Sequence, residues 1–194
     1  MLELEVIEKP ETAALTLDPV KGRILAALTT PGSAASLASG VGLTRQKVNY
    51  HLRVLEKHRL VEPVEQRQWG GITERMVVAT AASYVVSPAA LGPIAADPAR
   101  NSDRLSASYL IALAARIVRE VGALWTRARK TDKRLATLSY DTVIRFKSPA
   151  ERAAFTNDLT NAIASLAARY HDETAAGGRP HRLIVASYPA PNDS

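Results

Sequence analysis

The chain has 194 residues, of which 46% are hydrophobic and 23% are charged, a composition typical of folded globular domains. It contains no cysteine, which excludes disulfides, thiolate metal sites and cysteine nucleophiles. Lys and Arg outnumber Asp and Glu by 25 to 19, and the net charge of +6 favours a polyanionic partner without requiring one. The acidic start MLELEVIEKPE does not have the pattern of a signal peptide, and no apolar run reaches the length of a membrane span. We therefore expect a soluble, cytoplasmic protein.

The first half of the chain predicts short helices. Asp18 and Pro19 predict the start of a first helix, because Asp caps free N–H groups and Pro suits the first helical position. Its apolar face ends near residues 30–32. A second helix is expected over 33–39, and Thr44 is expected to cap a third.

Ala38, Gly42 and Val48 predict that the second and third helices form a helix-turn-helix. Such helices meet at a wide angle only if the contact residue is small, the turn residue tolerates a positive φ, and the second helix presents a branched apolar side chain. These residues have those properties in that order. Alternating runs at 60–66 and 72–79 predict a β-hairpin, the wing of a winged helix, with Trp69-Gly70-Gly71 at its tip.

The segment LASGVGLTRQKVNYHLRVLEKHRLVE, with ERMVVATAASYVVSP after the hairpin, resembles the ArsR-type winged-helix transcriptional regulators. The resemblance covers residues 18–88 and implies a DNA-binding domain whose third helix lies in the major groove. The chain departs from the metal-sensing branch of that family, because its third helix has no cysteine and its terminal helices have no His/Asp pair with ligand spacing. We therefore expect no metal site and no cofactor.

The polar face of the third helix predicts contacts to DNA. Arg or Lys pairs with guanine O6 and N7, Gln or Asn pairs with adenine, and Tyr contacts a phosphate or a thymine methyl group. The predicted contacts on this helix are Thr44, Arg45, Gln46, Lys47, Asn49, Tyr50 and Arg53. Those on the wing are Arg67, Gln68, Trp69 and Thr73, and Trp69 is equally open to packing on a partner subunit. The alternative for the helix is a solvated face that does not contact DNA.

A long helical pattern begins at about residue 103. Its apolar residues alternate spacings of four and three, as in a seam along which two helices pair. The predicted dimer-interface residues are Leu110, Ala114, Ile117, Val121, Leu124 and Ala128. The alternative is a single core helix within one subunit. We favour the dimer because winged helices of this kind read two half-sites about one DNA turn apart.

The last part of the chain predicts a small strand-helix-strand module. Residues 138–146 and 181–188 alternate as half-buried strands, and Ser148-Pro149-Ala150-Glu151 begins the helix between them. Aromatic residues of this half line either an apolar effector pocket or an ordinary core: Trp125, Tyr140, Phe155, Tyr170 and Tyr188.

These elements predict an α+β fold. A winged helix-turn-helix domain over 1–88, with an N-terminal arm at 1–17, is followed by a linker at 89–103. Residues 104–194 are expected to form a dimerisation domain that also has room for a small-molecule effector.

The function expected from this pattern is sequence-specific transcriptional regulation by a homodimer, more as a repressor than as an activator. The expected partners are double-stranded DNA and a second copy of the chain. We expect no enzyme, because the sequence has no phosphate-binding glycine loop, nucleophile elbow or triad spacing. The alternative is an architectural or protein-interaction winged helix that does not read base sequence.

Overall fold

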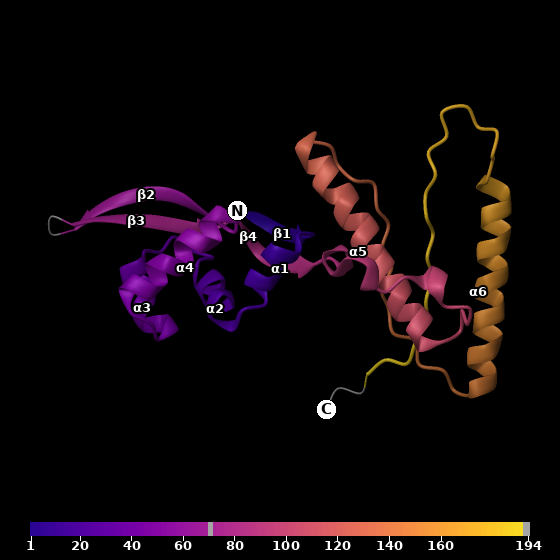
Figure 1. Ribbon diagram of the computed structural model, residues 1–194. Coiled ribbons are helices and arrows are strands. Elements are labelled where there is room, and N and C mark those ends of the chain that lie inside the picture. The colour runs from indigo at the N-terminus through magenta and orange to yellow at the C-terminus, as the bar shows by residue number, and fades with distance from the viewer. Residues whose placement is uncertain (70–71, 192–194) are drawn as a thin grey trace. The chain divides into compact units, whose positions relative to one another are not determined.

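The structure, a computed structural model, describes residues 1–69 and 72–191, and the side chains of 66–73 are excluded from the description (Figure 1). The chain divides into two compact units, Met1–Leu135 and Ala136–Ser194, each of which is described by itself. Helices are combined with small sheets, which confirms the α+β fold class.

The three predicted helices of the first unit are formed, and two of them begin after their predicted caps, Asp18 and Thr44. Asp18, Ser33 and Thr44 each accept a hydrogen bond from a backbone N–H group in the first turn of the helix that follows. These side chains satisfy donors that have no partner within the helix. The helices are α2 (Pro19–Ala27), α3 (Ala34–Val41) and α4 (Arg45–Lys57).

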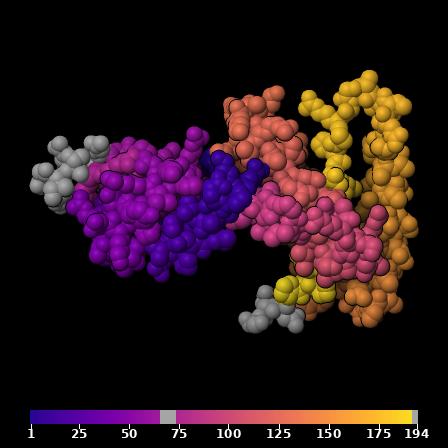
Figure 2. All heavy atoms as spheres, in the orientation of Figure 1, coloured from indigo at the N-terminus to yellow at the C-terminus, as the bar shows by residue number. Residues whose placement is uncertain are grey.

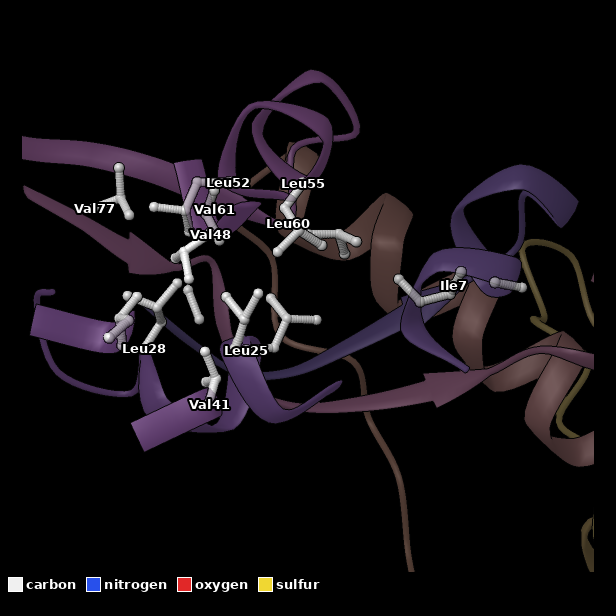
Figure 3. Packing of buried hydrophobic residues seen from close by; sticks show 14 residues of the cluster. Ile7, Leu25, Leu28, Val41, Val48, Leu52, Leu55, Leu60, Val61 and Val77 are labelled. Carbon is white, nitrogen blue, oxygen red and sulfur yellow. The ribbon is translucent and has the colours of Figure 1, made fainter. Parts of the chain in front are cut away.

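The helices and the wing share one hydrophobic core (Figure 3). Ile24 and Leu28 come from α2 and the residue that ends it, Val48 and Leu55 from α4, and Leu60 from the turn before the wing. All five are at most 1% exposed, and burial of each such side chain contributes roughly 1.5–3 kcal/mol. This core fixes the position of α4 relative to α2 and α3.

The predicted hairpin is formed by β2 (Val61–Trp69) and β3 (Ile72–Ala79), which pair antiparallel. The first strand is longer than predicted, and the predicted tip at Gly70-Gly71 lies outside the described residues. The base of the wing is also hydrogen-bonded to a segment outside the hairpin. Val77 and Gly32 exchange backbone hydrogen bonds of 2.9 Å, so β3 is tied to the segment between α2 and α3.

The predicted N-terminal arm at 1–17 is folded. It forms β1 (Leu2–Ile7) and α1 (Pro10–Thr16), and β1 pairs in parallel with β4 (Ala81–Val86). Ile7 is buried with the core of the helix-turn-helix domain, and Figure 2 shows the indigo N-terminal residues packed against that body. The alternation of Leu2, Leu4 and Val6 with glutamates is a strand signal, but its partner lies about 80 residues away.

The predicted linker at 89–103 contains the 3₁₀ helices η1 (Pro88–Ile94) and η2 (Pro98–Arg100), on which α5 (Ala107–Lys130) packs. Arg116 forms an ion pair with Asp97 at 3.3 Å, and Arg129 forms one with Glu5 of β1 at 3.1 Å. The structure therefore groups α5 with the first unit, whereas the sequence places it with the C-terminal module. Composition alone does not show which surface a helix packs on.

The crossing of α5 over β1 depends on Gly122. A Cβ atom at this position would lie 2.8 Å from Cγ1 of Val6, a short β-branched side chain with little freedom to move. We expect Gly122→Ala to lower the free energy of unfolding by about 1 kcal/mol, because overpacking outweighs the gain in helix propensity. Urea denaturation measures the change.

Gly40 in α3 is the matched control, because a Cβ there meets nothing within 4 Å. Gly40→Ala should raise the free energy of unfolding by about 0.5–1 kcal/mol. A loss of stability in both variants, or in neither, would contradict the proposed close contact at Gly122.

The carboxylate of Asp18 makes stability depend on pH. Hydrogen bonds from the backbone N–H and the ammonium group of Lys21 lower the pKa of Asp18 from 3.8 to about 2. Because the folded-state pKa is the lower one, the stabilisation is present above pH 3.8 and is lost as the pH falls towards 2. We expect the free energy of unfolding to fall more steeply over this interval in the native protein than in Asp18→Asn. Urea denaturation at a series of pH values tests this, and parallel curves would contradict it.

The second unit contains α6 (Pro149–Tyr170), which begins at the predicted cap, Ser148. The strands predicted at 138–146 and 181–188 are not formed within the described chain, which corrects the strand-helix-strand prediction. A strand requires a neighbour for its backbone N–H and C=O groups, and neither segment is paired in a sheet. In Figure 1 the yellow segment runs back along α6. Among the described residues, no helix combines the length and the hydropathy needed to cross a membrane.

Candidate nucleic-acid interface

The turn between α3 and α4 has the geometry that the sequence predicted. Gly42 ends α3 with φ 70° and ψ 32°, the left-handed conformation that favours glycine. The N–H of Leu43 donates to the carbonyl of Ala38 at 3.0 Å, which closes the turn. Val48 is fully buried in the core below it. The predicted framework of Ala38, Gly42 and Val48 is therefore present, and α4 follows it as the candidate recognition helix.

The helix α4 has one buried face and one exposed face. Val48, Leu52 and Leu55 point into the core. Every residue predicted to contact DNA from this helix is exposed: Thr44, Arg45, Gln46, Lys47, Asn49, Tyr50 and Arg53. The spacing of 3.6 residues per turn produces this separation. The exposed face is thus free for a ligand.

A groove of about 480 Å³ lies between α4, the start of α3 and the wing strand β3. Arg45, Gln46, Asn49 and Arg53 line its α4 wall. Thr44, Lys47 and Tyr50 are exposed on α4 outside this groove. The structure therefore brings together four of the predicted DNA contacts beside the stem of the wing.

The opposite wall of the groove contains residues that the sequence did not indicate. Ser33 Oγ donates to Glu74 Oε2 at 2.8 Å, which joins the cap of α3 to β3. Arg75 donates from both terminal nitrogens to the carboxylate of Glu56, which joins β3 to α4. This hydrogen bonding raises the pKa of Arg75 above its usual value. These contacts fix the stem of the wing relative to the helix.

The carboxylates that line the groove have hydrogen-bond partners within the protein, whereas two of its arginines form no ion pair among the described residues. The carboxylates of Glu56 and Glu74 already accept hydrogen bonds from Arg75 and Ser33. In contrast, Arg45 and Arg53 form no ion pair with any residue in the described part of the chain. A cation without a protein partner is available to a phosphate or to a guanine edge. The groove can therefore bind a polyanion although it contains carboxylates.

The predicted wing contacts lie on the strand ends next to the tip. Arg67 is paired with Glu74 in the ladder, Gln68 with Thr73, and Trp69 with Ile72. Their side chains are outside the described part of the structure. Their backbone positions agree with the predicted hairpin, and the contacts to DNA stay predictions.

His51 lies on the opposite side of α4 from the groove. Burial lowers the pKa of His51, and the nearby Lys21 lowers it further, against the effect of Asp18. The charged groups that act on His51 thus come from the start of α2. Among the described residues, no group of three or more His, Asp or Glu side chains is arranged to hold a metal ion.

The predicted dimer seam on α5 is uncovered within the first unit. Ile117 and Val121 are 38% and 41% exposed, and Leu124 is similarly exposed. Ala112 and Gly122, on another face of the helix, are buried. The complete seam consists of Leu110, Ala114, Ile117, Val121, Leu124 and Ala128, of which Leu110 and Ala128 are half-buried. The centre of the seam is thus exposed within the first unit, and the pairing of two α5 helices stays a prediction.

The aromatic residues proposed for an effector pocket are divided between the two units. Trp125 is half-buried on α5 in the first unit. In the second unit Phe155 packs against Phe146 with ring centroids 5.3 Å apart, whereas Tyr140, Tyr170 and Tyr188 are exposed.

The helix-turn-helix segment is similar to a known protein family. Residues 16–64 match a protein-family model described as "Helix-turn-helix domain". A similar solved structure is that of NolR from Sinorhizobium fredii, with 21% sequence identity and a TM-score of 0.30. That match covers 36% of this chain and 66% of that chain, a little under two thirds of its length. None of the curated proteins compared with the chain matches it. Residues 16–64 therefore form a helix-turn-helix domain.

Proposed function

We propose that this chain is a homodimeric, sequence-specific DNA-binding transcriptional regulator that acts as a repressor. The observation that carries the proposal is the exposed wall of α4, where Arg45, Gln46, Asn49 and Arg53 stand beside the wing. These residue types match the hydrogen-bonding edges of guanine and adenine. An α-helix fits the major groove, and a wing in this position reaches the flanking backbone.

The seam on α5 supports the homodimer. Its exposed apolar residues repeat at the spacing of paired helices, and a two-fold pair is the commonest closed assembly. Two copies would place two recognition helices on half-sites about 34 Å apart along the duplex. A regulator that occupies promoter DNA in this way blocks polymerase without any further surface, which is why we propose repression.

Other functions have less support. An enzyme is not part of the proposal, because no catalytic motif was found in the sequence. Control by a small apolar ligand stays a prediction, since the groove beside α4 is not lined by the aromatic residues suggested for it. The architectural alternative differs from the proposal in its lack of base readout, which can be measured.

The test is selection of bound DNA from a random pool with the purified full chain. We then compare the Kd for the selected duplex with the Kd for a base-shuffled duplex at two salt concentrations. The proposal expects a preference of about 1,000-fold or more and a site with two-fold symmetric halves. Equal affinity for both duplexes with a steep salt dependence would support the architectural alternative instead.

A further inference from the structure

In the second unit, the segment 138–147 has backbone groups without a strand partner in the described chain, and it has exposed apolar side chains. The segment 138–147 makes no backbone–backbone hydrogen bond with another described segment, although it alternates apolar and polar residues like a strand. Leu138 and Tyr140 are 94% and 88% exposed. A unit of this size rarely buries enough apolar surface to be stable without further partners.

The apolar face of this segment is covered at one end only. Phe146 is half-buried against Phe155 of α6, with ring centroids 5.3 Å apart, and Ile144 is 46% exposed. Coverage decreases towards Tyr140 and Leu138. The end of the segment that precedes α6 therefore has a covered apolar face, whereas the apolar side chains at the other end, Leu138 and Tyr140, are exposed.

We propose that the 138–147 segment forms an antiparallel strand pair with the same segment of a second copy, centred on Val143. In this register Tyr140 of each copy lies opposite Phe146 of the other. The exposed end of each strand therefore lies beside the end of the partner strand that packs against the partner's own α6. Two exposed apolar surfaces are buried by the same pairing.

The polar face supports the same register. With Val143 on the two-fold axis, Asp141 of each copy lies directly opposite Arg145 of the other. Both side chains are exposed, and neither forms an ion pair within the described chain. Opposite charges on directly facing residues stabilise antiparallel strands. A shift of the register by two residues loses the Asp141–Arg145 pairs: in one direction Arg145 faces Ser139, and in the other Asp141 faces Lys147. Charge complementarity thus selects a second copy of this chain as the partner.

The absence of native cysteine allows a direct test in the full chain. In the proposed register the two Val143 residues face each other, at a Cα separation of roughly 4.5–5.5 Å, within the range of a disulfide. We expect Val143→Cys to give covalent dimers under mild oxidation. Ser139→Cys is the control, because its two copies would lie roughly 26 Å apart. Dimers of Val143→Cys no more abundant than those of Ser139→Cys would overturn the proposal.

A charge exchange tests the register independently of any cross-link. Asp141→Arg should raise the dimer Kd about 10-fold, since two attractions become two repulsions. Asp141→Arg combined with Arg145→Asp should restore the native Kd. Sedimentation equilibrium measures all three proteins, and a Kd that does not change in the single variant would overturn the proposed register.

The inference depends on the proposed function only in taking the working form to be a homodimer. The reduced Val143→Cys protein, titrated with the selected duplex, separates the two. Operator preference without a cross-link overturns the strand pairing alone. A cross-link without operator preference overturns the proposed DNA readout alone.

Discussion

Replacement of Val121 by glutamate should strongly weaken dimerisation through α5 and lower the affinity of the protein for a two-half-site operator by about 100-fold or more. Within the first unit this side chain is 41% exposed, so the new carboxylate stays in water and the fold is preserved. In a pair of α5 helices, however, two carboxylates would be buried close together without partners, which costs several kcal/mol. The loss of dimerisation removes the second half-site from each binding event.

Ala123→Glu is the matched control for this variant. It adds the same charge to α5 at an exposed position on a different face of the helix. Sedimentation velocity gives the oligomeric state, and titration with full and half operators gives the affinity. Val121→Glu should bind the half operator with the same affinity as the native protein, but it should bind the full operator more weakly. Dimers of Val121→Glu as stable as those of the native protein would contradict the proposed seam.

The parts of the fold that the sequence predicts are those encoded within a few residues. Asp18, Ser33 and Thr44 cap helices through hydrogen bonds to backbone groups two or three positions away. Gly42 sets its turn through its own φ angle. Such local chemistry requires no knowledge of the rest of the chain, and α2, α3 and α4 are accordingly found where they were expected.

The parts that were missed depend on distant partners. β1 is a strand because β4 lies beside it, and α5 belongs to the first unit because Gly122 lets it approach Val6 closely. Neither relation has a local signal. The two strands expected in the second unit failed for the same reason. Both segments have the pattern of a strand, but neither is paired with a neighbouring strand in the described chain.

The candidate site divides in the same way. The helical period alone places Arg45, Gln46 and Asn49 on the exposed face of α4, so these residues were predicted. Glu74 and Arg75 line the groove because hydrogen bonds with Ser33 and Glu56 hold β3 against the start of α3 and against α4. These partners are 41 and 19 positions away in the chain, so the sequence has no local signal for the contacts.

Substitution of Arg45 or Gln46 by alanine should weaken binding to the selected operator by about 1–3 kcal/mol each and relax the preference at one base pair. Both side chains line the groove from the first turn of α4, the part of a recognition helix that contacts base edges. Both are exposed, so the free energy of unfolding should change little. Competition titrations against single-base variants of the operator measure the specificity.

Arg23→Ala separates base readout from general electrostatics. Arg23 is exposed on α2 and does not line the groove, so its loss removes one positive charge without touching the proposed contacts. This substitution should weaken binding to all duplexes slightly and equally, because a charge far from the base edges carries no sequence information. If Arg45→Ala behaves in the same way, Arg45 contacts a phosphate. If Gln46→Ala also leaves the base preference unchanged, then α4 does not read sequence, and the architectural alternative describes this protein better.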